Sequence, residues 1–352
     1  MINVGLAGYG LGGKVFHAPF VHLAPELRLH GVCSRTPERR EEAARDYEGI
    51  ATYVDYNQLL ADPDVDLVVL ATPHDTHAPM AIQAMDAGKH LVTDKVMCLN
   101  ETEARAMIEA SSRNKVLLSV FQNRRWDGDF LTLQDILASG ALGDVHTVES
   151  NITAFGGPHS GWRAWKRYGG GRTRDWGAHL VDQALQLFGA QVESVFADYQ
   201  FRYPEADSDV ESTAHCLLKF RNGVRFLIEL GTAWMFPKPR FHVRGSLGGF
   251  RKYGVDPQEA AIKMGTVATP VPEDPARYQM KVNTPEGNTQ EVGVQPRTGS
   301  YRTYYDNIGA VLARGEALLV KPEECLEAIK VIDAIVISAE NGEVVHLGAQ
   351  IG

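Results

Sequence analysis

The sequence lacks the features that mark membrane, secreted and nucleic-acid-binding proteins. No apolar run is long enough to cross a bilayer, and the first residues show no basic segment followed by an apolar one, so we expect neither a membrane span nor a signal peptide. The net charge is −9 and the basic residues form no stripe, which argues against nucleic acid and anionic membranes as partners. The chain also shows no convincing internal repeat or low-complexity tract.

Cysteine is scarce, with four in 352 residues and no CxxC pair. This spacing argues against a disulfide framework or a cysteine zinc site, and a reducing cytoplasm is the simplest setting. The remaining composition, 44% hydrophobic and 22% charged, is ordinary for a globular protein. Because the chain exceeds the length of one ordinary core, we expect two domains, residues 1–123 and 124–352. The cysteines are Cys33, Cys98, Cys216 and Cys325.

A glycine motif follows the first predicted strand, residues 2–7. Gly8, Gly10 and Gly13 have the GxGxxG spacing, and a helix is expected directly after them. In this setting the first glycine permits a tight turn, the second lets backbone approach a pyrophosphate, and the third lets the helix pack close to the strand. The pattern predicts dinucleotide binding. The alternative is a glycine-rich turn in an α/β domain that binds no dinucleotide.

The second predicted strand, residues 27–33, ends without a carboxylate. An NAD-specific fold usually has an acidic residue here to bind the ribose 2′-hydroxyl. This chain has Ser34 and Arg35 instead, with Arg39 and Arg40 one turn further on. Because a guanidinium suits a phosphate, we expect NADP to be preferred, with NAD possible. The alternative is a surface arginine that leaves both cofactors acceptable.

Strands and helices alternate through the first 123 residues, which predicts an α/β fold with a Rossmann-type, doubly wound parallel sheet. In such sheets ligands bind at the carboxyl ends of the strands. Further strands are expected over 51–53, 65–71, 90–93 and 116–121, with helices over 37–47, 55–61, 78–87 and 101–112. The expected cofactor-binding residues are Gly8, Gly10, Leu11, Gly12, Gly13, Ser34, Arg35, Thr72, Pro73, His74, His77, Asp94, Lys95 and Gln122.

The second predicted domain is α+β, with a large open and mostly antiparallel sheet, because its apolar residues alternate with period two. One face of such a sheet can cover an active site and the other needs burial, so we expect a homodimer or homotetramer through this sheet. Residues 270–300, rich in Pro, Thr, Gln and Gly, are expected to be a long loop or lid. Strands are expected over 145–153, 192–202, 213–220, 224–232 and 240–245, and helices over 130–138, 175–188 and, packing back on the chain, 322–341.

Asp175 and His179 are four residues apart on a predicted helix, which places them on one face. A carboxylate can fix the tautomer of an imidazole, and histidine suits proton transfer in both directions of an alcohol oxidation. We therefore assign His179 as general acid/base and Asp175 as its orienting residue or a hydroxyl ligand. The alternatives are a dipole-favoured Asp with a structural histidine, and a metal site that adds Asp182, although a closed zinc site usually has more His or Cys ligands.

Several segments together resemble the Gfo/Idh/MocA oxidoreductases, named for glucose–fructose oxidoreductase and inositol dehydrogenase. They are Gly8-Tyr9-Gly10, Ala71-Thr72-Pro73 with His77, Ala87-Gly88-Lys89-His90, Lys95, and Gly169-Gly170-Gly171 with Asp175 and His179. The segments 121–127 and 252–258 are similar to a subgroup that includes NADP-dependent inositol dehydrogenases. The resemblance implies a dehydrogenase acting on a small-molecule cyclic polyol or sugar. It also places Lys95 between nicotinamide and substrate. The expected substrate site is Lys95, Asp175 and His179, with Trp162 and Arg163 of the long loop as further candidates and a solvated loop charge as the alternative for Arg163.

One departure from the family pattern keeps other functions open. The family usually has Glu-Lys-Pro, often with a cis bond, where this chain has Asp94-Lys95-Val96, so we expect a trans bond and a differently shaped loop. A redox-neutral glycosidase or aldose–aldose oxidoreductase with tightly bound NAD(H) is one alternative. A non-catalytic cofactor-binding regulator is another, although Lys95, Asp175 and His179 argue against it. Among weaker candidates, His17 could reach the pocket or be a core or surface histidine, and Asp182 could bind a sugar hydroxyl or cap its own helix.

Overall fold

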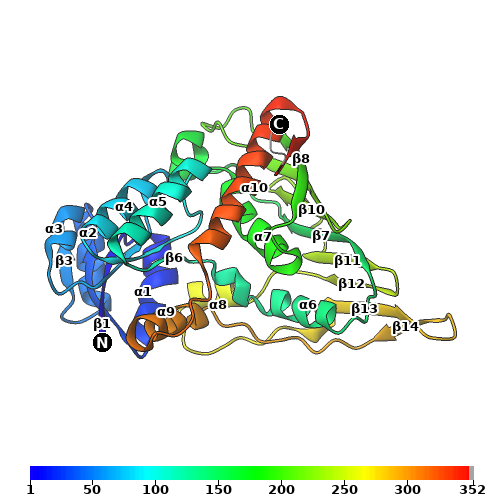
Figure 1. Ribbon diagram of the computed structural model, residues 1–352, viewed down its shortest axis with the longest axis horizontal. Coiled ribbons are helices and arrows are strands. Elements are labelled where there is room, and N and C mark those ends of the chain that lie inside the picture. Colours follow the sequence, from blue (N-terminus) through cyan, green and yellow to red (C-terminus); the bar gives the residue numbers. More distant parts are fainter. Residues whose placement is uncertain (349–352) are drawn as a thin grey trace. The chain divides into compact units, whose positions relative to one another are not determined.

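The structure is a computed structural model that describes residues 1–348 (Figure 1). The described part divides into two compact units, each discontinuous in sequence. The first unit contains residues 1–123, 258–270 and 300–329, and the second contains 124–257, 271–299 and the segment from 330 onward. Residues 349–352, the end of the expected second domain, lie outside the described residues.

The described strands of the first unit form a six-stranded parallel sheet in the order β3-β2-β1-β4-β5-β6. The central strands carry continuous apolar runs because both faces of the sheet are covered, and Val4, Leu6 and Val69 are fully buried. The predicted doubly wound Rossmann sheet is confirmed. The strands are β1 Ile2–Ala7, β2 Leu27–Cys33, β3 Ala51–Tyr53, β4 Leu67–Leu70, β5 His90–Thr93 and β6 Leu118–Val120.

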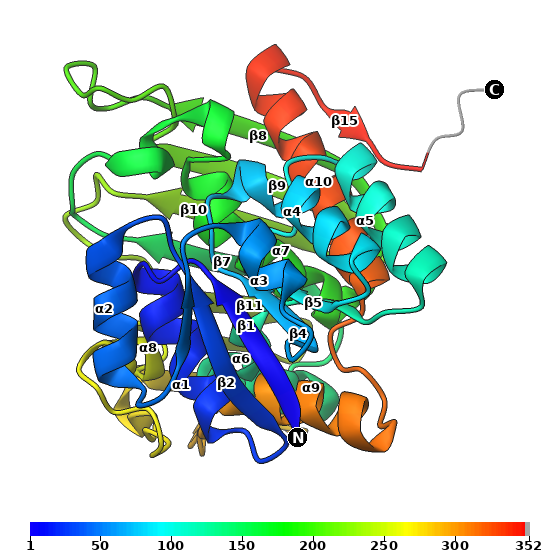
Figure 2. The ribbon, with the colours of Figure 1, turned by 90° about the vertical axis from the view of Figure 1, so that its left-hand side faces the viewer.

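Helices follow these strands in the alternation that the sequence predicts. The turn after β1 leads into a π-helical segment, Gly12–His17, that continues as α1. α4 packs beside α5, as Figure 2 also shows, and α1 packs beside α9, which comes from much later in the chain. The helices of this unit are α1 Ala18–Leu23, α2 Pro37–Asp46, α3 Tyr56–Ala61, α4 His77–Asp86, α5 Glu101–Asn114, α8 Gln258–Lys263 and α9 Arg302–Arg314.

In the second unit, the described strands form a nine-stranded sheet in the order β14-β13-β12-β11-β7-β10-β9-β8-β15. Every neighbouring pair is antiparallel except β7 and β10, which run parallel, so the predicted mostly antiparallel sheet is confirmed. The strands are β7 Val145–Thr153, β8 Val192–Gln200, β9 Thr213–Phe220, β10 Arg225–Gly231, β11 Phe241–Gly245, β12 Gly248–Lys252, β13 Tyr278–Asn283, β14 Thr289–Val292 and β15 Val345–His346.

One face of the second sheet is packed and the other is open. α7 packs against β9 and β10, and the last turns of α10 reach β8, where the Ser338 hydroxyl accepts a hydrogen bond from the Ala197 N–H. On the opposite face Phe196, Leu217 and Leu227 are cross-strand neighbours and remain 36–42% exposed. The helices of this unit are α6 Gly128–Ala138, α7 Arg172–Phe188 and the later part of α10 Pro322–Asn341.

The expectation that residues 270–300 form an irregular loop or lid is wrong. Tyr278–Asn283 and Thr289–Val292 form the hairpin β13–β14 at the edge of the nine-stranded sheet. Tyr278 and Met280 are buried, while the residues of β14 are largely exposed. A polar edge strand of this kind is hard to distinguish from a loop by composition alone.

Buried polar groups accompany the apolar core of the second unit. Lys252 is fully buried and lies 3.1 Å from Asp129 and 3.2 Å from Glu273. Within the described residues the four cysteines are buried and form no disulfide. None of the described helices combines the length and the apolar character that a bilayer span requires.

Candidate functional site

The glycine loop after β1 has the geometry that a dinucleotide requires. Gly8 has φ +101°, and a Cβ added there would lie 2.4 Å from the Ala71 carbonyl oxygen. A Cβ on Gly13 would lie 2.0 Å from the Gly8 carbonyl oxygen, whereas one on Gly10 would meet no described atom within 4 Å. The outer glycines are therefore required by the fold itself. The middle one leaves open space beside backbone that a pyrophosphate can approach, so these residues fit the cofactor.

Asp94 lies beside this loop. It is partly buried at the end of β5, and its Oδ2 lies 3.3 Å from the position of a Cβ on Gly12. Its other oxygen accepts a hydrogen bond of 2.8 Å from the Lys95 N–H. Burial raises the pKa of Asp94, but its interactions with His17 and the charge of Lys95 outweigh burial and hold the pKa well below its ordinary value. Asp94 is therefore an ionised group that fixes the backbone of Lys95.

His17 is a buried partner of Asp94 rather than a surface histidine. Its Nε2 lies 3.5 Å from Asp94 Oδ2, and its Nδ1 lies 2.6 Å from the Tyr305 hydroxyl. Tyr305 belongs to α9, and its pKa is raised well above the ordinary value because it is buried. Since Tyr305 keeps its proton, it can donate to Nδ1 and leave the N–H of His17 facing Asp94.

The end of β2 leaves one arginine unpaired. The Arg39 guanidinium lies 2.6 Å from Glu42, and Arg40 donates a 2.6 Å hydrogen bond to the Ser34 carbonyl. Arg35 is exposed and has no hydrogen-bond or ion-pair partner among residues 1–348. The Ser34 hydroxyl accepts a 3.3 Å hydrogen bond from the Thr36 N–H. Arg35 is therefore the guanidinium at this strand end that can bind a further anion.

His77, expected among the cofactor ligands, is fully buried and serves the loops instead. Its Nδ1 lies 2.8 Å from the Val96 carbonyl and its Nε2 lies 3.0 Å from the Thr72 carbonyl. Burial lowers the pKa of His77, so the neutral ring donates to one of these carbonyls. It ties the end of β4 to the segment after β5, and it can influence a cofactor only through those loops. His74 is also buried, with its ring 5.5 Å from that of His77.

The peptide bond between Lys95 and Val96 is cis. The expectation of a trans bond is therefore wrong. It rested on the local preference of non-proline bonds, which the surrounding fold can override.

The remaining expected cofactor residues of the first unit also lie at strand ends. Thr72 accepts a 2.7 Å hydrogen bond from the Thr76 hydroxyl, and Pro73 precedes the short 3₁₀ turn that leads into α4. Gln122 follows β6 and is 4% exposed. Its side-chain oxygen is buried and has no partner among the described residues, which leaves it able to accept a hydrogen bond from a ligand.

In the second unit, α7 carries the predicted acid–base pair. Asp175 lies in the first turn of Arg172–Phe188, and His179 follows one turn later with 5% of its surface exposed. The Trp176 ring lies 6.0 Å from that of His179 and stacks under the Arg124 guanidinium at 3.9 Å. Helix geometry directs Asp175 and His179 to the same side of α7.

Asp182 has a different role from either one that the sequence suggested. Arg125 binds its two carboxylate oxygens at 2.6 and 2.8 Å, and both side chains are almost fully buried. Because a bidentate arginine already holds this carboxylate, we assign it to the structure rather than to a sugar hydroxyl, a helix cap or a metal. The sequence could not reveal the pair because its members are 57 positions apart.

Trp162 and Arg163 lie on the segment before α7. The Arg163 guanidinium stacks over the Trp162 ring at 4.4 Å. The Arg163 carbonyl accepts a 3.1 Å hydrogen bond from the Gly171 N–H, which ties this segment to the start of α7. The same segment contains His159, and Arg172 begins the helix. Sequence reasoning missed both residues, although Arg172 stands three positions before Asp175, on the same side of α7.

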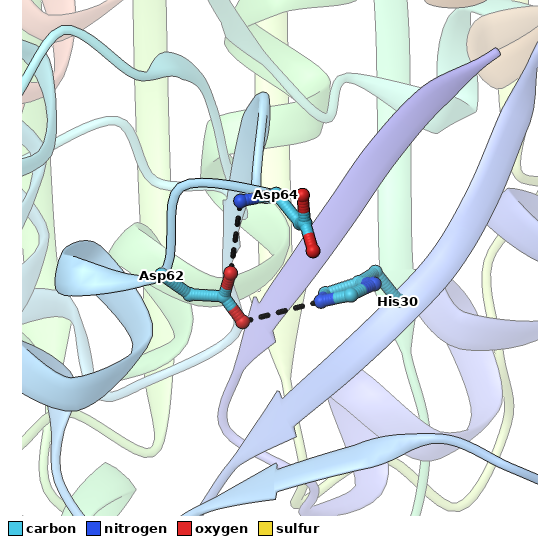
Figure 3. A group of neighbouring side chains, drawn as sticks. All are labelled: His30, Asp62 and Asp64. Atoms are coloured by element: carbon cyan, nitrogen blue, oxygen red, sulfur yellow. Dashed lines mark hydrogen bonds and ion pairs between the residues drawn. The ribbon is translucent and has the colours of Figure 1, made fainter.

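A separate cluster in the first unit joins His30, Asp62 and Asp64 (Figure 3), whose potential metal-ligand atoms lie within 4.8 Å of one another. Asp62 accepts hydrogen bonds from the Tyr53 hydroxyl at 2.6 Å and the Asp64 N–H at 2.8 Å, and His30 Nε2 lies 3.2 Å away. The Lys89 ammonium donates to the Asp62 carbonyl at 2.9 Å. These bonds give the cluster a structural role, which is to hold the loop between α3 and β4.

Comparison with known proteins identifies two family matches along the chain. Residues 2–122 match the oxidoreductase family with an NAD-binding Rossmann fold, and residues 130–251 match the GFO/IDH/MocA C-terminal domain. The chain is 30% identical to scyllo-inositol 2-dehydrogenase (NADP(+)) IolW of Bacillus subtilis, covering 98% of this chain and 96% of the relative. It is 35% identical to the uncharacterized oxidoreductase YdgJ of Escherichia coli, covering 97% and 96%. A solved NAD-binding protein from Listeria innocua has a TM-score of 0.86 at 30% identity, covering 98% and 96%.

Proposed function

This chain belongs to the GFO/IDH/MocA family of oxidoreductases, and we propose that it transfers hydride between NADP(H) and a hydroxyl-bearing carbon of a cyclic polyol or sugar. The observation that carries the proposal is the glycine loop. Backbone atoms leave no room for a Cβ at Gly8 or Gly13, whereas the space beside Gly10 is open. A bound nicotinamide dinucleotide supplies the hydride acceptor or donor. The name of the Bacillus subtilis relative, an NADP-dependent scyllo-inositol 2-dehydrogenase, supports the polyol class.

The preference for NADP over NAD rests on Arg35. Its guanidinium is exposed and unpaired among the described residues, whereas Arg39 and Arg40 are engaged. A carboxylate at this position would repel a 2′-phosphate, and Ser34 and Arg35 offer a hydroxyl and a cation in its place. Gly10, Gly12 and the groups at the ends of β4, β5 and β6 would hold the rest of the dinucleotide.

We assign the chemistry on the substrate to Lys95, Asp175 and His179. His179 takes the hydroxyl proton at a ring nitrogen during oxidation and returns it during reduction. Asp175 orients the imidazole or binds a neighbouring hydroxyl. The Lys95 ammonium, whose backbone is fixed by Asp94, stabilises the developing alkoxide.

Substitutions at two of these positions test the assignment. We expect Lys95→Met and His179→Ala to bind NADPH as the unchanged protein does, measured by fluorescence titration, and to lose about 10²–10⁴-fold in kcat on a polyol that the unchanged protein oxidises. Turnover equal to that of the unchanged protein would overturn the roles. Nicotinamide cofactor that copurifies and does not exchange would instead support the redox-neutral alternative.

The same titration tests the cofactor preference. Arg35→Ala should weaken NADPH binding by about 10- to 100-fold, since a charge-assisted hydrogen bond contributes roughly 1.5–3 kcal/mol. The affinity for NADH should stay unchanged. Arg39→Ala is the matched control, because its guanidinium is already paired with Glu42. An equal loss of NADH and NADPH affinity in Arg35→Ala would contradict the proposal.

We also propose that the open face of the second sheet forms a contact between copies of this chain. Phe196, Leu217 and Leu227 are adjacent on three strands and exposed, and burying such a row stabilises association. Leu217→Glu should shift the protein toward the monomer in light scattering. A mass unchanged by this substitution would contradict this interface.

A further inference from the structure

The entrance to α7 combines cationic, acidic and imidazole side chains. Arg172 begins the helix, Asp175 and His179 follow on the same side, and His159 and Arg163 lie on the preceding segment. The acidic groups that act on Arg172 are Asp175 and Glu211. Glu211 is 4% exposed and accepts a 2.7 Å hydrogen bond from the Thr173 N–H. Burial raises the pKa of Glu211, which weakens it as a counter-charge.

Two of these side chains are partly removed from solvent and keep a buried nitrogen without a hydrogen-bond partner. The Arg172 guanidinium has no hydrogen-bond or ion-pair partner anywhere in residues 1–348, and its Nε is fully buried. The His159 Nε2 is likewise buried, and its ring has no partner in the described chain. Leaving a buried donor unsatisfied is costly, so native proteins usually keep such groups for a ligand or an ordered water. A guanidinium in particular favours a planar or tetrahedral oxyanion.

A small cavity lies next to His159. His159 lines it together with Arg202, Tyr203 and Glu211, and its volume is about 80 Å³. That is room for a few water molecules, and therefore for a small anionic group rather than a whole sugar ring. Arg202 adds a further cation, since its guanidinium is bonded only to the neutral Gln200 amide at 2.8 and 3.1 Å among the described residues.

We propose that the substrate carries an anionic substituent, a carboxylate or a phosphate ester, which Arg172 and His159 bind beside Asp175 and His179. This inference rests on the proposed function and narrows its substrate class from neutral polyols to acidic or phosphorylated sugars. Arg172 is then a specificity-determining residue. It selects the substrate by charge and takes no part in proton or hydride transfer.

Protonation of His159 strengthens the same site. Burial and the charges of Arg172 and Arg163 lower the pKa of His159 to about 4, and Asp175 opposes them. A bound anion reverses that balance by pairing with the imidazolium, so anion affinity rises as pH falls from 7 toward 5. Replacing His159 with Gln keeps a hydrogen-bond donor and removes the titration.

The test compares matched neutral and anionic compounds with the NADP⁺-loaded protein. D-Glucose, D-glucuronate, D-glucose 6-phosphate and inorganic phosphate are titrated while the fluorescence of the tryptophans, including Trp162 and Trp176, is followed. In the unchanged protein at least one anion should bind about 10-fold or more tightly than glucose. Tighter binding of glucuronate than of glucose identifies the anionic substituent as a carboxylate. Tighter binding of glucose 6-phosphate than of glucose identifies it as a phosphate ester.

Substitution of the arginine separates a binding role from a structural one. Arg172→Met should weaken binding of the preferred anion by about 10- to 100-fold and change the affinity for glucose by less than about 2-fold. The matched control is Arg167→Met, whose exposed guanidinium stacks on Trp165 and Tyr168 and should leave every affinity unchanged. Glucose bound as tightly as the anions, an absence of saturable anion binding, or equal losses for glucose and anion in Arg172→Met would each overturn the proposal.

The binding assay needs no turnover, which keeps the two proposals separate. Anion binding that depends on Arg172, together with no NADP⁺ reduction by any sugar, would refute the dehydrogenase proposal and leave this inference standing. NADP⁺ reduction by neutral polyols without any anion preference would refute this inference alone.

Discussion

The two units present polar groups in different ways. In the first unit, the proposed dinucleotide site is built on the backbone of the loop after β1, where a Cβ on Gly8 or Gly13 would collide with backbone. In the second unit, several polar groups packed on α7 are side chains held by other side chains. Arg125 is bound to Asp182, and Arg240 donates to Gln183 at 2.6 Å.

This difference determines whether a substitution mainly affects ligand binding or stability. A backbone site depends on the absence of a side chain, so adding one methyl group can remove the ligand without unfolding the protein. A site made of paired side chains depends on partners that are distant in sequence, so removing one partner leaves the other buried and charged. We therefore expect the largest losses of stability in the second unit and the cleanest losses of ligand binding in the first.

The largest expected effect comes from breaking the pair between Arg125 and Asp182. Asp182→Ala should reduce the free energy of unfolding by about 3–5 kcal/mol in urea titrations, because Arg125 then stays buried without a counter-charge. Glu101→Ala is the matched control, since the exposed pair of Glu101 with Arg105 contributes only about 0.3–0.5 kcal/mol.

A double substitution keeps this prediction informative if Asp182→Ala does not fold. Replacing Arg125 with Met and Asp182 with Leu removes both charges, and should recover most of the lost stability. A loss below about 1 kcal/mol in Asp182→Ala would show that the second unit does not depend on its charge pairs.

Substitutions in the glycine loop should have a smaller effect on stability, and they should separate the loss of stability from the loss of NADPH binding. Gly8→Ala should cost about 1–3 kcal/mol, because φ +101° strains any residue with a Cβ and the Ala71 carbonyl lies 2.4 Å from the added atom. Gly10→Ala should change the free energy of unfolding by less than about 0.5 kcal/mol, since its added methyl points into open space. The same methyl should weaken NADPH binding, because it occupies the space proposed for the pyrophosphate. Thermal unfolding and NADPH titration of both variants measure the two effects, and Gly10→Ala with unchanged NADPH affinity would contradict the backbone site.

The same contrast explains how much of the molecule could be predicted from its sequence. The strands Ile2–Ala7, Leu27–Cys33 and His90–Thr93 have the bounds expected from their apolar runs, because a strand buried on both faces must be apolar throughout. The glycine motif likewise marked the tight turn after β1 and the close approach of the following helix, which depend on local sequence. The hairpin of β13 and β14 was missed because an edge strand exposes polar residues and has no such constraint.

Long-range partners were beyond local patterns. The sequence left His17 open as a pocket, core or surface residue, because its contact with Tyr305 joins residues 288 positions apart. The pairing of Lys252 with Asp129, 123 positions apart, likewise follows from the sheet topology and not from any spacing in the sequence. Arg172 had a usable signal in its helical spacing from Asp175, but its lack of a partner could be seen only in the folded chain.

The smallest expected effect concerns His159, whose pKa makes the unfolding free energy depend on pH. Its pKa in the folded chain is about 4, against an ordinary value of about 6.5, so below pH 6.5 the unfolded chain binds a proton that the folded chain does not. Stability is therefore fully present above about pH 6.5, falls as pH decreases through this window, and stops falling near pH 4. Between pH 7 and pH 5, His159→Gln should lose about 1 kcal/mol less of its unfolding free energy than the unchanged protein, after allowance for solvent screening. An identical pH dependence in both proteins would mean that burial and the nearby arginines do not lower the pKa of His159, and the contrast between the two units would then rest on the paired charges alone.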